Sequence, residues 1–393
     1  MSILPKKLFA DLKVIRKASP ANLRRLVEPF RNYLRSRGYD PPCFSSPSQD
    51  DLELLASIIV QPTEETPGEF SGALFLVNGL ASPAASDLLV EEAQAMGLPL
   101  EGTESLADLA IMIHLADPEA ARRCHGKLLV DRMRTYESYQ TDRQPLPEFR
   151  VPDAQTLERL RLDLERWFEG KLRGRGVCVI TSGSTPWFGL IVRHGDLIRR
   201  EGALGEDGSP DSIVYRPEKY DAAFYHAALG ELRINARSKG DKNKYRMAIG
   251  EHLFGNADFF PPTQERYTLE PLRRAGRESL HCGDVPGIRE VRLTALKLYF
   301  GGAYSEVRVI EGSDVLGIFE KRGKGFPMDG VIKSATFALT LENSKRPRKL
   351  TVRTPNVASF SRDADSPMIE EWLARRGFAS PAPLQEVGHA IAS

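Results

Sequence analysis

The stretch that decides the fold class spans residues 176–202 and reads GVCVITSGSTPWFGLIVRHGDLIRREG. It holds short runs rich in β-branched and aromatic residues, separated by Gly, Ser, Pro and Asp, and this pattern is typical of antiparallel strands joined by turns. Similar runs follow at 212–217, 222–227 and 231–236. The sequence therefore predicts an antiparallel β-meander in the middle of the chain.

Helical signals surround this meander. Upstream, apolar residues recur at three- and four-residue spacing, with a break expected at Pro29 and a helix boundary at Pro118. Asp153 is expected to cap a strong helix, and residues 241–254 return to helical spacing. The Pro-rich segment 141–153 is the expected linker between the first two regions.

The last third of the chain is rich in β-forming residues. Four strands are expected at 290–300, 305–310, 331–342 and 348–354, followed by a helix with Ser366 at its N-cap and Pro367 in its first turn. We therefore expect an α+β protein with three regions. They are a mostly helical, charge-segregated N-terminal region (1–150), a central meander with helices (151–270), and a β-rich C-terminal region closed by a helix (271–393).

Size and composition set broad limits. The chain has 393 residues, a net charge of +1, 41% hydrophobic and 27% charged residues, values ordinary for a soluble globular protein. No apolar run approaches the roughly 18 residues of a membrane span, and the N-terminus lacks a signal-peptide pattern. The four cysteines lie far apart, which favours reduced thiols. We expect a cytoplasmic protein with no membrane contact, no metal and no cofactor.

Charge is distributed unevenly near the N-terminus. Residues 1–40 contain ten Lys/Arg and three Asp/Glu, a net of +7, whereas residues 41–120 contain fourteen Asp/Glu and no Lys or Arg. Opposite charge in adjoining segments predicts that they contact each other or bind partners of opposite sign. The acidic segment 41–120 is therefore a candidate docking surface for a protein partner.

The sequence around Arg193, His194 and Gly195 offers a catalytic alternative. A strand running into Arg-His-Gly resembles the start of a histidine phosphatase, over residues 189–201 only. The resemblance implies that His194 is the phosphorylated nucleophile and Arg193 a phosphate ligand. This chemistry also needs a second histidine and an acid, and the histidines at 226, 252, 281 and 389 have no matching context. Because Gly195–Asp196 suits a two-residue turn, we expect His194 to lie in a hairpin.

Other catalytic signatures are absent from the sequence. It contains no GxxxxGK[ST], GxSxG or HExxH motif, and no GxGxxG after a strand. The Gly/Ser-rich segment 181–186 precedes a strand and suits a hairpin loop rather than a phosphate cradle. Without a complete catalytic constellation, the sequence favours a binding role over an enzymatic one.

Two basic clusters stand above the background. The first has six cations against Asp241 alone, and the second is the dense part of a C-terminal loop. Such loops suit phosphate contacts, and the candidate nucleic-acid-binding residues are Arg233, Arg237, Lys239, Lys242, Lys244, Arg246, Lys345, Arg346, Arg348 and Lys349.

These observations favour a protein that binds nucleic acid, either DNA or RNA. A bacterial regulatory or antiviral genome-defence role would suit such a protein. The alternatives are a phosphate-ester hydrolase built on Arg193 and His194, and a protein–protein adaptor that docks through residues 41–120.

Overall fold

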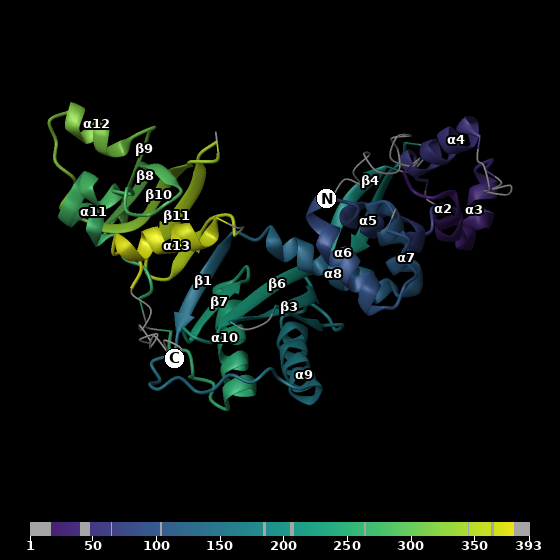
Figure 1. Cartoon of the computed structure of the whole chain (residues 1–393), viewed down its shortest axis with the longest axis horizontal. Coiled ribbons are helices and arrows are strands. Elements are labelled where there is room, and N and C mark those ends of the chain that lie inside the picture. Colours follow the sequence, from purple (N-terminus) through teal and green to yellow (C-terminus); the bar gives the residue numbers. More distant parts are fainter. Residues whose placement is uncertain are drawn as a thin grey trace, which may run out of the picture. The chain divides into compact units, whose positions relative to one another are not determined.

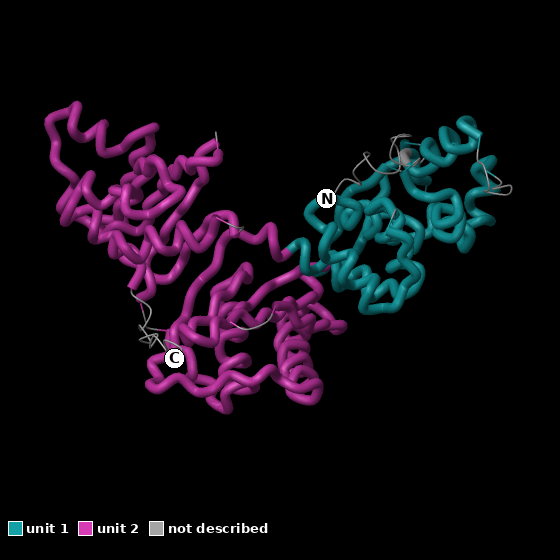
Figure 2. Tube along the Cα trace, viewed as in Figure 1, with its two compact units in different colours: residues 1–129, 197–217 teal, residues 130–196, 218–393 magenta. Residues whose placement is uncertain are grey.

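A computed structural model describes residues 17–39, 48–63, 65–102, 104–183, 186–204, 208–262, 265–344, 346–362 and 365–380. The chain forms two compact units, drawn in separate colours in Figure 2. Unit 1 comprises residues 1–129 and 197–217, and unit 2 comprises residues 130–196 and 218–393. A segment of unit 1 is thus inserted into the sequence of unit 2.

Unit 1 consists of helices and one two-stranded hairpin (Figure 1). The elements are α2 (Pro20–Val27), η1 (Glu28–Phe30), α3 (Arg31–Ser36), α4 (Gln49–Val60), α5 (Gly68–Leu80), η2 (Pro83–Ala85), α6 (Ser86–Ala95), α7 (Leu106–Ala116), α8 (Pro118–Asp131), β4 (Arg199–Leu204) and β5 (Pro210–Tyr215). The break at Pro29 and the helix start at Pro118 are confirmed, since η1 separates α2 from α3 and α8 begins at the proline.

The basic and acidic segments of unit 1 contact each other. Asp108 accepts hydrogen bonds from the Ser19 backbone N–H at 2.7 Å and the Asn22 amide at 2.9 Å, and α2 and α7 share one apolar core. Arg24 and Arg31 each pair with Glu28 inside the basic segment. The predicted contact is therefore confirmed for the described residues. Apolar packing and hydrogen bonds make it, and these bonds include those of Asp108, one between the Tyr33 and Thr66 hydroxyls and one from Arg37 to the Gln61 carbonyl. Residues 1–16, which carry four of the cations, lie outside the described part.

Unit 1 contains several apolar helices, whose length and composition bear on whether they could span a membrane. Within the described residues no single helix is long and apolar enough to cross a bilayer. The pair Gly68–Leu80 and Pro83–Ala95 passes together by length and composition, but it bends by 83°. The apolar side chains of α5 are buried in the core of unit 1.

Unit 2 is built on one ten-stranded sheet in which all neighbouring strands are antiparallel. Its strand order is β2-β3-β6-β7-β1-β12-β11-β10-β8-β9. Strand β1 (Thr135–Gln140) pairs with β12 (Val357–Ser359) and so joins an N-terminal half-sheet to a C-terminal half-sheet.

The N-terminal half-sheet contains β1 with the predicted meander strands. They are β2 (Cys178–Ser182), β3 (Trp187–Gly195), β6 (Glu218–His226) and β7 (Glu231–Asn235), with α9 (Ala154–Gly170) and α10 (Lys239–Phe254) on one face. Successive side chains of a strand point to opposite faces, so Phe188, Leu190 and Val192 pack together with the helices.

The C-terminal half-sheet carries its helices on the other face. It contains β8 (Ile288–Gly301), β9 (Glu306–Glu311), β10 (Val331–Leu341), β11 (Arg348–Arg353) and β12, with α11 (Glu270–Ala275), η3 (Gly276–Leu280), α12 (Val315–Lys321) and α13 (Ser366–Arg375). Tyr136 pairs with Ala358, which lies in the core beneath α13, whereas Tyr139 packs in the core beneath α9 and α10. Residues 136 and 139 face opposite sides, so the helices α9 and α10 pack on one face of the sheet and α13 on the other.

The predicted fold class is confirmed: the protein is α+β, with an antiparallel meander and a C-terminal half-sheet. All four strands expected after residue 290 form. The sequence analysis did not predict strands β1 and β12. It also placed the N-cap of α13 at Ser366, whereas the N-cap residue is Asp365. The division at residues 150 and 270 stays a prediction, because the two contact-defined units do not test which segments fold alone.

The expected hairpin at Gly195–Asp196 is wrong. Strand β3 pairs with β2 and β6, while β4 pairs with β5 in a separate sheet. The physical reason is burial: β3 is almost entirely buried, whereas β4 begins with Arg199, Arg200 and Glu201 and has only exposed or half-buried side chains. A strand so charged is a poor neighbour for β3 in the core.

The Pro-rich segment 141–153 runs within unit 2, from β1 to α9. Phe149 packs with its ring centroid 5.3 Å from that of Phe188 and 5.1 Å from that of Tyr225. The segment therefore covers the core of the N-terminal half-sheet.

Candidate functional sites

The first candidate site is the open face of the C-terminal half-sheet, the face that α11 and α13 do not cover. Antiparallel partners share a face, and the registers place Arg292, Ala338 and Lys349 in one row across β8, β10 and β11. Next comes a row of small and hydroxyl residues, Ala295, Thr336, Thr351 and Ser359. The third row contains Lys297, Ser334 and Arg353.

The cations on this open face point to solvent. Lys297, Lys349 and Arg353 are exposed, whereas the hydroxyl residues between them are half-buried. A shallow hollow of about 350 Å³ lies beside Thr294, Ala295, Thr336, Ala338 and Lys349. Glu311 also lies in this hollow, so the basic character is not uniform. The face is therefore polar and carries exposed positive charges.

The predicted basic cluster near α10 is largely committed to internal partners. Arg233 and Arg246 are buried. Lys242 pairs with Glu137 at 2.9 Å, and Lys244 pairs with Asp163 at 2.7 Å. Their bonds leave these four side chains poorly placed for an external phosphate.

Two residues of the same cluster are exposed. Arg237 lies 3.6 Å from Asp196 and keeps 78% of its side-chain surface in solvent. Lys239 is exposed at the first residue of α10. These two remain candidate contacts, at the end of the N-terminal half-sheet.

The predicted C-terminal cluster is divided in the same way. Lys349 lies on the open face and Arg346 is exposed in the preceding loop. Arg348 instead pairs with Asp365 at 2.7 Å. Lys345 lies outside the described residues.

His194, the alternative catalytic residue, is buried on the helix-covered face of β3. Its ring stacks on Phe168 with centroids 4.0 Å apart, Nδ1 lies 2.8 Å from the Gly195 carbonyl oxygen, and Nε2 lies 3.1 Å from Asp221. Arg193 points to the other face and lies 3.5 Å from Glu218. Among the described residues no second histidine contacts the ring, and the geometry is that of a packed structural histidine.

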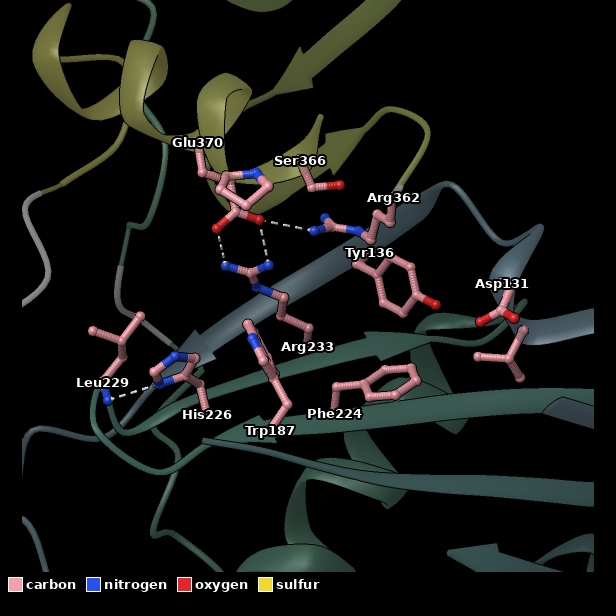
Figure 3. A pocket seen from close by; sticks show the side chains of 12 residues that line it. Asp131, Tyr136, Trp187, Phe224, His226, Leu229, Arg233, Arg362, Ser366 and Glu370 are labelled. Carbon is pink, nitrogen blue, oxygen red and sulfur yellow. Dashed lines mark hydrogen bonds and ion pairs between the residues drawn. The ribbon is translucent and has the colours of Figure 1, made fainter. Parts of the chain in front are cut away.

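The second candidate site is a cavity of about 460 Å³ in unit 2 (Figure 3). It lies on the face of the N-terminal half-sheet that α9 and α10 do not cover, with α13 as another wall. Its aromatic walls are Tyr136, Trp187 and Phe224, and its polar walls are Asp131, His226, Arg233, Arg362, Ser366 and Glu370. These residues come from β1, β3, β6, β7, α8 and the segment from β12 into α13.

A buried ionic network forms the floor of this cavity. Arg233 holds Glu231 through Nε and Nη2 at 3.0 and 3.1 Å, and Glu370 through Nη1 and Nη2 at 2.6 and 3.0 Å. Arg362 donates from Nη1 to Glu370 at 3.1 Å, and Arg266 lies 3.5 Å from Glu231. Arg362 is also placed 4.7 Å from the Tyr136 ring centroid, a cation–π contact.

The environment shifts the pKa values of this network. Burial alone would raise the pKa of Glu231, but the charges of Arg233 and Arg266 outweigh it and lower that pKa to about 2. Burial and the like charge of Arg233 lower the pKa of Arg362. Burial and Arg233 also lower the pKa of His226, and burial raises the pKa of Asp131.

The described residues contain no group of three or more His, Cys, Asp or Glu that could hold a metal ion. Compared with known proteins, the chain matches no family model and no curated protein sequence.

Both sites include residues that the sequence did not single out. Lys297 lies in the apolar second half of β8, and its only signal is the alternation that puts it on the opposite face from the core residues Leu296 and Leu298. The cavity residues are spread from Asp131 to Glu370, and no local pattern joins them.

Proposed function

We propose that the protein binds nucleic acid through the open face of the C-terminal half-sheet. The observation that supports this most is the set of solvent-exposed cations in register on a sheet face that α11 and α13 leave uncovered. Phosphate contacts supply most of the sequence-independent affinity for nucleic acid.

The spacing of the cations suits a phosphate chain. Lys297 and Arg353 lie two strands apart, about 10 Å at the usual strand spacing, and Lys349 lies four residues from Arg353 along β11, about 13 Å. The hydroxyl groups of Thr336, Thr351 and Ser334 lie between them. Thr336 and Thr351 are bonded to each other at 3.0 Å, so one hydroxyl of that pair, together with Ser334, can donate to phosphate oxygens. Because no large aromatic side chain projects from these rows, we expect binding with little sequence preference.

The test is a triple substitution, Lys297→Ala, Lys349→Ala and Arg353→Ala, measured by fluorescence anisotropy with labelled single-stranded DNA, duplex DNA and RNA across a salt series. Losing three phosphate contacts is expected to flatten the log affinity versus log salt line by about 2 to 3 units. The matched control replaces three exposed cations of α9 and its C-cap, Arg159, Arg166 and Lys171, by Ala.

The proposal fails if the unaltered protein shows no salt-sensitive binding at micromolar concentration. It also fails if the α9 control weakens binding as much as the open-face variant does. Hydrolase activity would then need its own evidence, because His194 is packed as a structural residue. Adaptor binding through residues 41–120 would need the isolation of a binding partner. The regulatory or defence role stays a prediction.

A further inference from the structure

We propose that the cavity between the N-terminal half-sheet and α13 binds a nucleotide, with its phosphate on Arg362 and the first turn of α13 and its base among Tyr136, Trp187 and Phe224. The proposal goes beyond polyanion binding on the open face, uses different residues and stands without it. Four features of the cavity carry it.

The first feature is an uncompensated positive charge. Among the residues that the structure describes, the ionic network contains Arg233, Arg266 and Arg362 but two carboxylates, Glu231 and Glu370. Asp131 lies beyond Tyr136 in Figure 3 and pairs with none of these arginines among the described residues. A buried charge without a partner is unfavourable, so an anion entering the cavity would relieve the excess.

The second feature is an arginine with unused donors. The Nε and Nη2 groups of Arg362 are buried and have no hydrogen-bond partner within the described part of the chain. These two N–H groups form the edge of a guanidinium that binds phosphate or carboxylate with two parallel bonds. Both N–H groups are shielded from water in this structure. The Arg362 guanidinium must therefore turn toward the cavity to bind an oxyanion. Its side chain keeps 17% of its surface exposed, and the turn would exchange its bond to Glu370 and its ring contacts with Tyr136 and Phe360 for bonds to the oxyanion.

The third feature is the N-terminus of α13. Ser366, Pro367 and Glu370, from its first turns, line the cavity. The N-cap residue Asp365 makes no side-chain hydrogen bond to this turn, because its carboxylate pairs with Arg348. The first backbone N–H groups of a helix attract anions. Pro367 has no N–H, so here those of Ser366 and Met368 accompany the excess arginine charge.

The fourth feature is the shape and chemistry of the remaining walls. Three aromatic rings line a space much larger than a lone phosphate, and flat rings are the usual surfaces for stacking a base. His226 accepts the Leu229 N–H on Nδ1 at 3.2 Å, so its neutral ring carries the proton on Nε2 and is a donor. Asp131 is an acceptor on the opposite side in Figure 3. A base with both donors and acceptors on its edge fits this arrangement.

The experiment uses the full chain and isothermal titration calorimetry with AMP, GMP, CMP and UMP. Comparison ligands are the four nucleosides, inorganic phosphate and a 5′-phosphorylated tetranucleotide. We expect at least one nucleotide to bind one per chain, and its nucleoside and inorganic phosphate to bind at least tenfold more weakly. Tighter binding of the tetranucleotide would assign the site to a strand end, and equal or weaker binding to a free nucleotide.

Variants locate the binding. Arg362→Gln removes the uncompensated charge and is expected to fold while losing tenfold or more in nucleotide affinity. Phe224→Leu tests the base wall if Arg362→Gln does not fold. The matched control is Arg308→Gln. Arg308 lies outside the cavity, 4.4 Å from the Phe300 ring centroid, and its side chain is 59% exposed, so this variant should bind the nucleotide with normal affinity.

Absence of binding by every nucleotide at millimolar concentration overturns the proposal, as does normal affinity in both cavity variants. The open-face triple variant is expected to retain nucleotide binding. Failure of the nucleic-acid proposal and failure of this one are therefore distinguishable.

Discussion

At the scale of single residues, burial decides what a side chain does. His194 follows Arg193 in a pattern that resembles a phosphatase, but both its ring nitrogens face acceptors, the Gly195 carbonyl and the Asp221 carboxylate. The Asp221 carboxylate also accepts from Tyr245 at 3.0 Å. The ring thus ties β3 to β6 and α10 beneath the packed face of Phe168.

We predict that His194→Ala lowers the free energy of unfolding of unit 2 by about 2 to 4 kcal/mol, because it opens a cavity and removes buried hydrogen bonds. Urea unfolding followed by tryptophan fluorescence measures this. The control is His281→Ala, at a side chain 54% exposed, for which a change within about 0.5 kcal/mol is expected. A cost at position 194 as small as that of the control would contradict the buried-network interpretation.

At the scale of elements, α10 shows how a helix is fitted to its neighbours. Ser238 caps its start, and Gly255 ends it in the left-handed conformation at φ 67°. Within the helix, a Cβ built on Gly250 would lie 2.6 Å from the backbone oxygen of Asn256, whereas one on Gly240 would meet nothing closer than 3.7 Å. Glycine is therefore required at position 250 by the close approach of the following loop.

We predict opposite outcomes for two Gly→Ala substitutions in α10. Gly250→Ala should destabilise unit 2 by about 1 to 3 kcal/mol, because the backbone in contact must move. Gly240→Ala should be neutral or stabilise by up to about 1 kcal/mol, the usual gain of alanine in a helix. Chemical denaturation of both variants measures the difference, and equal stabilities would show that the loop yields without cost.

At the scale of the whole molecule, the chain leaves unit 2 after β3 and returns at β6. Gly195 and Glu218 pair directly at the end of these two strands, so the excursion through β4 and β5 closes at adjacent points. The inserted hairpin belongs by its contacts to unit 1. All three tryptophans, Trp167, Trp187 and Trp372, lie in unit 2 and report on that unit alone.

We predict that replacing residues 197–217 by Asn-Gly leaves the tryptophan-detected stability of unit 2 within about 1 kcal/mol, because the resulting three-residue connection Asp196-Asn-Gly closes strands that already pair at Gly195 and Glu218. Unit 1 should lose stability, seen as a lower melting temperature of its helices by circular dichroism. Loss of the tryptophan transition would show that unit 2 depends on the inserted hairpin.

Local sequence determined most elements of this protein. Capping residues, prolines and the alternation of apolar residues correctly predicted the α9 start, the four strands after residue 290 and the α+β class, because these signals act within a few residues. The density of cations singled out Lys349 as part of a hairpin loop, whereas it lies exposed in strand β11. The local signals missed β1, whose Thr and Tyr residues favour a strand but whose polar composition conceals its central position in the sheet.

Tertiary structure alone decided strand partners, exposure and the cavity. The pairing of β3 with β6 across an inserted hairpin depends on which strand can bury its side chains, not on the turn that follows β3. The sequence predicts Arg233 and Arg246 to be surface cations. In the structure both are buried, Arg233 bonded to Glu231 and Glu370 and Arg246 to the Phe260 carbonyl. The cavity joins Tyr136 to Glu370 because β1 pairs with β12. Contacts between residues so far apart in the chain form only when the whole sheet assembles. No local sequence pattern encodes these contacts.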